Sequence, residues 1–346
     1  MIISSKTPNP SPTRRSVELP SCTVVVCTRQ RPVELRRCLE SLCRLNYSRL
    51  SILVVENDAA PGDAEQIARE YGASYRLCTY RGLSAARNLG VRSCFSDLLA
   101  FIDDDAVCDP DWIRNAVSLF EDERIDIVTG KVIFHSDPAC TSAATHEFDP
   151  GDHLVDRKTK DWFGMTVFGG VGLGGNFIVR RDCMEQIGGF DERLGRGALM
   201  HASEENLFVF RAVDAGCRIG TCSRSLVRHP FHDSNNSDAP IRSIAISTAM
   251  VALLALEHSR HFGDLCRYLW GAIRRTPQSW RQRPVHLLEG MAKSRLKVYF
   301  ALFAGPFLYA FTAITHLIGG TPNFPAKGVR GVEEIAAQSA APKMRA

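Results

Sequence analysis

The sequence predicts an α/β fold with a mostly parallel β-sheet flanked by helices. Two segments are continuous apolar runs, as in strands covered on both faces: Cys22–Cys27 (CTVVVC) and Leu98–Ile102 (LLAFI). Between them, apolar residues recur with helical spacing in Val33–Cys43. Strands that alternate with helices in this way are typical of βαβ units, which join parallel strands.

The other elements follow in chain order. Ser51–Val55 predicts a second strand, Ala64–Tyr71 a helix, Ser74–Leu77 a short strand, and Gly82 the start of a further helix. Later, the polar stretch Thr141–Thr166 predicts a mobile loop and Asn176–Arg181 a strand. Because ligands of parallel sheets bind beyond the carboxyl ends of the strands, the segments TRQRP, ENDAAPGD and DDDAVCDP are expected to line one crevice.

Composition excludes several classes of protein. With 346 residues, 45% of them hydrophobic and 23% charged, the chain is neither collagen-like nor wholly disordered. The 42 Lys and Arg residues barely exceed the 38 Asp and Glu residues, so no nucleic-acid partner is expected. The 12 cysteines include no CxxC pair, which argues against a zinc site and favours a reducing, cytoplasmic location.

The chain divides into four parts. Residues 1–20 and 321–346 predict disordered tails, residues 21–235 a catalytic domain, and residues 236–320 a helical, basic and apolar region. Arg260–Lys297 contains nine basic and two acidic residues, and Val298–Ile318 has 21 residues without a formal charge. This pattern predicts association with the cytoplasmic face of a membrane. A spanning helix, a bent interfacial helix pair and an element covering the sheet remain open, because Gly305 and Pro306 interrupt the run.

Three consecutive aspartates are the strongest local signal. In extended backbone Asp103 and Asp105 point the same way and Asp104 the other way, so Asp104 is expected to tolerate Asn. Carboxylates that converge beyond a buried strand suit Mg²⁺ or Mn²⁺, which also bind substrate phosphates. The alternative is a solvated Asp-rich turn.

Other candidates bind anions or carry protons. Arg81 and Arg87 flank the helix start at Gly82 and form a candidate anion site. Glu56 ends the second strand and is a candidate acceptor for a base or ribose group. Further along lie Asp191, Glu204 and Glu205, with Ser203 as a candidate N-cap and helix capping as the alternative role of the two glutamates. His229, close to His232, is a candidate metal ligand or a structural hydrogen-bonding residue.

Over about residues 20–232 the chain resembles family-2 glycosyltransferases with the nucleotide-diphospho-sugar (GT-A) fold. The resemblance rests on an ordered series of segments: VVVCTRQRP, LVVENDA, RGLSAARNLG, FIDDDA, GGNFIVRR, GGFDERLG, SEENLF and RHP. It implies an inverting, metal-dependent transfer of a sugar from a nucleoside-diphosphate sugar, first of all a UDP-sugar, to an acceptor hydroxyl. Such transfers build cell-surface polysaccharides, glycolipids or glycosylated secondary metabolites.

The resemblance also implies roles for individual residues. The nucleotide-sugar site would comprise Thr28, Arg29, Glu56, Arg81, Arg87 and Asp103, and the Mn²⁺ or Mg²⁺ site Asp103, Asp105 and His229. The donor-sugar and acceptor side would comprise Gly175, Asn176, Asp191, Arg193 and Glu204. Glu205 would be the catalytic base, and helical geometry predicts that Glu204 faces elsewhere.

Two positions depart from the family pattern, which usually has Asp where Glu56 and Glu205 stand. Glu keeps the charge but moves the carboxylate by one methylene. Two other functions therefore stay open: a nucleotidyltransferase that makes activated sugars, and a non-catalytic homologue docked at a membrane. The absence of glycine from TRQRP counts against the first of these.

Overall fold

The computed structural model describes residues 19–135 and 146–230, apart from 123, 168, 169, 199 and 201, together with six isolated positions after residue 260. The predicted tail 321–346, and most of residues 1–20 and 236–320, lie outside the described residues. Of Val298–Ile318, only four positions are described. Within the described part of the chain, no helix has the length and apolar character needed to cross a bilayer.

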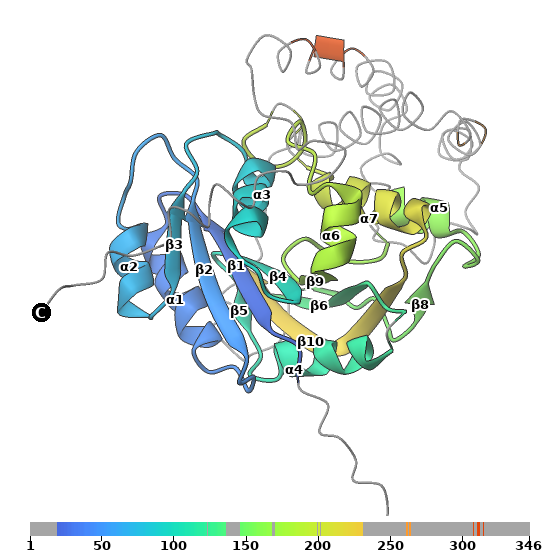
Figure 1. Ribbon diagram of the computed structural model, residues 1–346, viewed down its shortest axis with the longest axis horizontal. Helices are drawn as coiled ribbons and strands as arrows, with labels where there is room; N and C mark the ends of the chain where they lie inside the picture. Colours follow the sequence, from blue (N-terminus) through green and yellow to red (C-terminus); the bar gives the residue numbers. More distant parts are fainter. Residues whose placement is uncertain are drawn as a thin grey trace, which may run out of the picture.

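One ten-stranded sheet forms the centre of the fold, with helices on both of its faces (Figure 1). The strands are β1 (Cys22–Thr28), β2 (Leu50–Glu56), β3 (Ser74–Leu77), β4 (Leu98–Asp103), β5 (Val107–Cys108), β6 (Ile127–His135), β7 (His146–Phe148), β8 (Leu154–Val155), β9 (Phe177–Arg180) and β10 (Ile219–Pro230). The helices are α1 (Pro32–Leu42), α2 (Ala64–Glu70), α3 (Leu83–Ser93), α4 (Trp112–Val117), α5 (Trp162–Val167), α6 (Arg181–Ile187) and α7 (Glu204–Ala215), with a 3₁₀ turn at Ser118–Glu121.

The strand order along the sheet is β3-β2-β1-β4-β9-β6-β10-β5. The first four strands are parallel, as predicted, whereas β9 runs antiparallel to both β4 and β6. The sheet is therefore mixed. After β1 the chain builds outward to β2 and β3 and then returns to place β4 on the other side of β1, so the carboxyl ends of β1 and β4 form a topological switch point, where open α/β sheets bind ligands.

Alternation along the strands creates two hydrophobic cores. Val24 and Val26 of β1 point to the face that α1, α2 and α4 cover, whereas Val25 points to the face covered by α3, α6 and α7 (Figure 1). All three valines are at most 1% exposed. Burial on both faces explains why the strand sequences are continuously apolar.

The prediction of a mobile loop over Thr141–Thr166 was wrong for the described part of that stretch. It contains β7, β8 and α5. β8 pairs with the beginning of β10, and α5 buries Phe163 and Val167. These short elements are stabilised by partners far along the chain, which a local polar composition does not reveal.

Candidate active site at the carboxyl edge of the sheet

Three adjoining cavities lie along the carboxyl ends of β1, β2 and β4. The β2 cavity, about 470 Å³, is lined by Thr28, Arg31, Glu56 and the loop 58–64. The central cavity, about 230 Å³, shares Thr28 and Arg31 with it and adds Arg29, Asn57, Arg81 and Asp103–Asp105 among others. The β10 cavity, about 250 Å³, contains Gly174, Gly175, Glu204, Glu205 and His229 among others, and shares Leu83, Asp103 and Arg196 with the central cavity. The three cavities form a continuous series along this edge.

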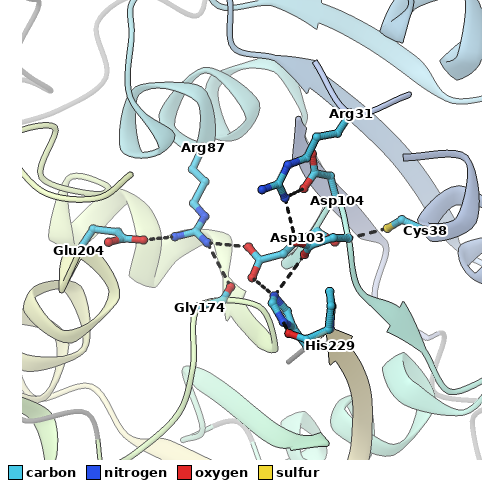
Figure 2. Close-up of polar contacts among 10 residues, drawn as sticks. Arg31, Cys38, Arg87, Asp103, Asp104, Gly174, Glu204 and His229 are labelled. Carbon is cyan, nitrogen blue, oxygen red and sulfur yellow. Dashed lines mark hydrogen bonds and ion pairs between the residues drawn. The ribbon is translucent and has the colours of Figure 1, made fainter. Parts of the chain in front are cut away.

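The acidic triplet lies where these cavities meet. Nε2 of His229 is 3.4 Å from Oδ2 of Asp103 (Figure 2) and 3.2 Å from Oδ1 of Asp105, so the two carboxylates converge on one imidazole. Asp104 turns away and accepts a hydrogen bond of 2.7 Å from the Thr28 hydroxyl. Asp103 and Asp105 therefore face one side and Asp104 the other, as expected, although residues 104 and 105 form a turn rather than a strand.

The environment sets the charges of these groups. Burial works to lower the pKa of His229, but its contacts with Asp103 and Asp105 outweigh burial and raise the pKa to about 10. Burial raises the pKa of Asp104 to about 6, against the contacts with Thr28 and Arg31 that lower it. Arg31 also contacts Asp105 at 2.8 Å, so one guanidinium bridges both sides of the triplet.

The donor set of this cluster fits a divalent cation. Two carboxylate oxygens and an imidazole nitrogen, from Asp103, Asp105 and His229, lie within 4.8 Å of one another. Carboxylates suit Mg²⁺ and Mn²⁺, while an added imidazole favours the transition metal. The residues present therefore match Mn²⁺ better than Mg²⁺.

Arg87 connects the triplet to the acidic pair on α7. Its guanidinium lies 2.8 Å from Glu204 Oε1 and 3.5 Å from Asp103 Oδ1, between the two carboxylates in Figure 2. Arg87 and Glu204 are only 4% and 6% exposed, and the guanidinium also lies over the Phe190 ring. Burial works to lower the pKa of Arg87, but Glu204 and Asp103 raise it. Because Arg87 belongs to α3 and Glu204 to α7, this buried ion pair fixes the two helices relative to each other.

The expectation that Glu204 and Glu205 face different surroundings was wrong, because both line the β10 cavity. Both lie at the first turn of α7, where the backbone enters from Ser203 at φ +73°. Ser203 stands at the N-cap position of α7, as predicted, but its side chain makes no capping hydrogen bond. Burial and the neighbouring Glu204 raise the pKa of Glu205 to about 8, although Arg87 acts to lower it.

The buried Arg87–Glu204 pair is expected to stabilise the fold. We expect Glu204→Gln to lower the free energy of unfolding by ~2–3 kcal/mol. This is less than the loss expected if the side chain that pairs with Arg87 were removed, because Gln can still hydrogen-bond Arg87. Chemical denaturation would measure the change. Glu185→Gln is the matched control, since Glu185 pairs with Arg181 at the surface, and it should have little effect. Equal unfolding midpoints for the two variants would contradict the role assigned to Glu204.

The structure also locates the remaining predicted residues. Glu56 is 3% exposed and accepts hydrogen bonds from the Gly62 backbone N–H and the Tyr75 hydroxyl, at the wall of the β2 cavity. Arg29 and Arg81 line the central cavity. Gly175 lines the β10 cavity, where a Cβ would lie 2.7 Å from Asp103 Oδ2, so a larger residue would displace the Asp103 carboxylate.

Three expected donor-sugar residues, Asn176, Asp191 and Arg193, make structural contacts instead of lining the three cavities. Asn176 is fully buried, accepts a bond from Trp112 Nε1, and donates to the backbone oxygens of Lys131 and Ser225. Asp191 accepts bonds from Arg193 and Arg211, and the pKa of its carboxyl is lowered because these contacts outweigh burial. The pair Asp191–Arg193 fixes the loop that precedes α7.

Sequence reasoning missed Arg31 and Arg196. Arg31 is part of TRQRP, and nothing local distinguishes it from Arg29. Arg196 stands between two glycines in the segment LGRGA. That spacing was the available signal, since a residue flanked by glycines often lies on a tight turn.

Comparisons with known proteins identify similar sequences and folds. Residues 23–188 match the model of a family described as Glycosyl transferase family 2. The chain is 26% identical over 220 residues to glycosyltransferase AglE of Haloferax volcanii, which covers 61% of this chain and 67% of AglE. It is 33% identical over 121 residues to the succinoglycan biosynthesis protein ExoM of Rhizobium meliloti, covering 33% of this chain and 39% of ExoM.

Among solved structures, that of S. aureus TarS superimposes with a TM-score of 0.50 at 14% identity, covering 86% of this chain and 55% of TarS. This likeness shows a shared fold. The matched regions span between 56% and 67% of the length of the first three curated relatives.

Proposed function

We infer that the chain, whose residues 23–188 match the family model, is a member of glycosyl transferase family 2. From this premise we propose that the three adjoining cavities bind one nucleoside-diphosphate sugar across the acidic triplet. The nucleoside occupies the β2 cavity, the diphosphate the central cavity, and the sugar with its acceptor the β10 cavity. The observation that carries this placement is the position of Asp103, which lines both the central and the β10 cavity beside His229.

The arrangement supports single displacement with inversion at the anomeric carbon. Glu205 is the base: its carboxylate accepts the proton of the acceptor hydroxyl, whose oxygen bonds to the anomeric carbon. The bond from that carbon to the diphosphate oxygen breaks, and its electron pair leaves with the nucleoside diphosphate. A Mn²⁺ ion at Asp103, Asp105 and His229 would stabilise the negative charge of the diphosphate.

The carboxylate of Glu56, at the wall of the β2 cavity, favours a nucleobase that presents an N–H group to it. A carboxylate accepts hydrogen bonds but cannot donate them, so it favours uracil, thymine or guanine over a base edge made of acceptors. UDP-sugars are the donors we propose first, with GDP- and dTDP-sugars as the alternatives. The name of the relative ExoM, a succinoglycan biosynthesis protein, supports an acceptor in glycan assembly, such as a cell-surface polysaccharide.

The test is the release of free nucleoside diphosphate from UDP-, GDP- and dTDP-sugars, with and without Mn²⁺. A sugar transferase releases nucleoside diphosphate with at least one donor. A nucleotidyltransferase would instead produce nucleotide sugar and pyrophosphate from a nucleoside triphosphate and a sugar phosphate. A non-catalytic homologue would produce neither, and either of these results would overturn the proposal.

We also propose that the C-terminal region associates with an anionic membrane on its cytoplasmic side. Phe307, Phe311 and Ile314 are helical and 76%, 58% and 54% exposed, and their spacing places them on one face of a helix. The basic stretch Arg260–Lys297 precedes this face and would face anionic lipids.

Fractionation of the full chain tests the membrane proposal. We expect the protein in the membrane fraction, with partial release by high salt and further release by carbonate if it lies at the interface. Phe311→Glu should shift it toward the supernatant, whereas Phe95→Glu, at an exposed position following α3, should not. A wholly soluble wild-type chain would contradict membrane association without affecting the proposed transfer.

A further inference from the structure

Arg196 stands at the junction of two cavities. Among the described residues, only three line both the central and the β10 cavity: Leu83, Asp103 and Arg196. Leu83 is apolar and Asp103 is an anion, so Arg196 is the cation at this junction. A donor that extends from one cavity into the other must pass this guanidinium.

The backbone around Arg196 is constrained to present it there. Gly195 and Gly197 have φ values of +98° and +90°, which favour glycine on both sides of the arginine. The Arg196 carbonyl accepts a hydrogen bond of 2.8 Å from the Leu83 N–H at the start of α3. On the other side the Gly195 N–H donates to the Met200 carbonyl, and Leu194 and Met200 are fully buried. The side chain of Arg196 is thus exposed, whereas the turn that carries it is held in place by these hydrogen bonds and buried neighbours.

Three of the neighbouring arginines are already paired with carboxylates. Arg81 makes no ion pair among the described residues, but it lines the central cavity and not the β10 cavity. Arg87 lies between Glu204 and Asp103, Arg31 contacts Asp104 and Asp105, and Arg29 lies 3.6 Å from Asp58. Among the ion pairs of the described residues, none involves Arg196, which is exposed and directed to the cavity junction. Its guanidinium is therefore available for an anionic ligand, and it can hold two phosphate oxygens at once.

We propose that Arg196 is a catalytic residue that binds the donor diphosphate and stabilises the charge of the leaving group. This inference rests on the proposed sugar transfer. As the bond between the anomeric carbon and the diphosphate oxygen breaks, its electron pair moves onto the leaving oxygen, and Arg196 donates hydrogen bonds to it. The proton of the acceptor goes to Glu205, so the charges balance. Because this interaction strengthens in the transition state, Arg196 acts mainly on kcat.

Steady-state kinetics of nucleoside-diphosphate release test the proposal. We expect Arg196→Ala to lower kcat by about 10²–10³-fold with a much smaller change in the donor KM. Arg196→Lys keeps the charge but loses the bidentate geometry, so it should lie between Arg196→Ala and wild type. Arg114→Ala is the matched control, because Arg114 is exposed on α4, away from the cavities, and kcat should not change.

A second readout separates charge stabilisation from a structural role. Added guanidinium ion should restore part of the kcat of Arg196→Ala but not of Glu205→Gln, and the melting temperature of Arg196→Ala should match wild type. A wild-type kcat in Arg196→Ala, a loss confined to KM, or a lost kcat that guanidinium leaves unchanged would each overturn the role of Arg196. Absence of nucleoside-diphosphate release by the wild-type chain would instead overturn the proposed function itself.

Discussion

Replacement of Asp105 by Ala is expected to abolish sugar transfer, with a loss of about 10³-fold or more, and to remove the requirement for a divalent ion in donor binding. Asp105 is 5% exposed and faces both His229 and Arg31, so its deletion removes one of the three groups proposed to hold the metal ion. Donor turnover measured over a Mn²⁺ titration would show both effects.

Asp104→Asn is the control within the same triplet. Its oxygen can still accept the hydrogen bond from Thr28, and the weakened contact with Arg31 should lower thermal stability more than turnover. Wild-type Mn²⁺ dependence in Asp105→Ala, or equal damage by both substitutions, would contradict the division of the triplet into metal-binding and structural carboxylates.

Replacement of Glu205 by Gln is expected to lower kcat by roughly 10²–10⁴-fold while donor affinity stays close to wild type. Gln keeps the size and hydrogen bonding of the side chain but cannot accept the acceptor proton. Glu204→Gln is the matched control on the adjacent residue, and it should reduce stability more and turnover less. An unchanged transfer rate in Glu205→Gln would mean that the base lies elsewhere.

The raised pKa of Glu205 gives this variant two further signatures. A base must be ionised, so kcat/KM of the wild type should rise with pH through about 8, and Glu205→Gln should lack this rise. The folded state favours the protonated carboxyl, so folding stability is highest below the ordinary pKa of 4.5 and falls as pH increases through about 8. Glu205→Gln removes this loss, and thermal melts should therefore show it to be more stable than wild type at pH 8–9.

The first half of the fold could be predicted because its elements are encoded locally. β1 and β4 are buried on both faces and therefore read as continuous apolar runs, and β3 begins and ends where its sequence predicts. β8 consists of two residues, paired to β10 more than 60 positions later. Its conformation depends on that partner, so a local pattern could not predict it.

Part of the candidate site could likewise be predicted from the sequence, and part could not. The series of strand ends predicted that Thr28, Glu56 and Asp103 lie at one edge. The roles within α7 depend on backbone geometry that composition does not encode: the positive φ of Ser203 leads into a first turn whose two glutamates both line one cavity. Likewise, the pairing of β10 with β6 brings His229 to Asp103, although 126 positions separate them in the chain.

The most direct test of the proposed nucleotide site is calorimetric titration of the full chain with UDP, GDP and dTDP, each with and without Mn²⁺. It requires no knowledge of the acceptor and reports on the nucleotide site alone. We expect one of the three nucleotides to bind with one-to-one stoichiometry and an affinity that rises strongly with Mn²⁺ in the wild type but not in Asp105→Ala. Absence of binding by all three nucleotides, or an affinity that Mn²⁺ does not change, would contradict a metal-assisted diphosphate site at Asp103, Asp105 and His229.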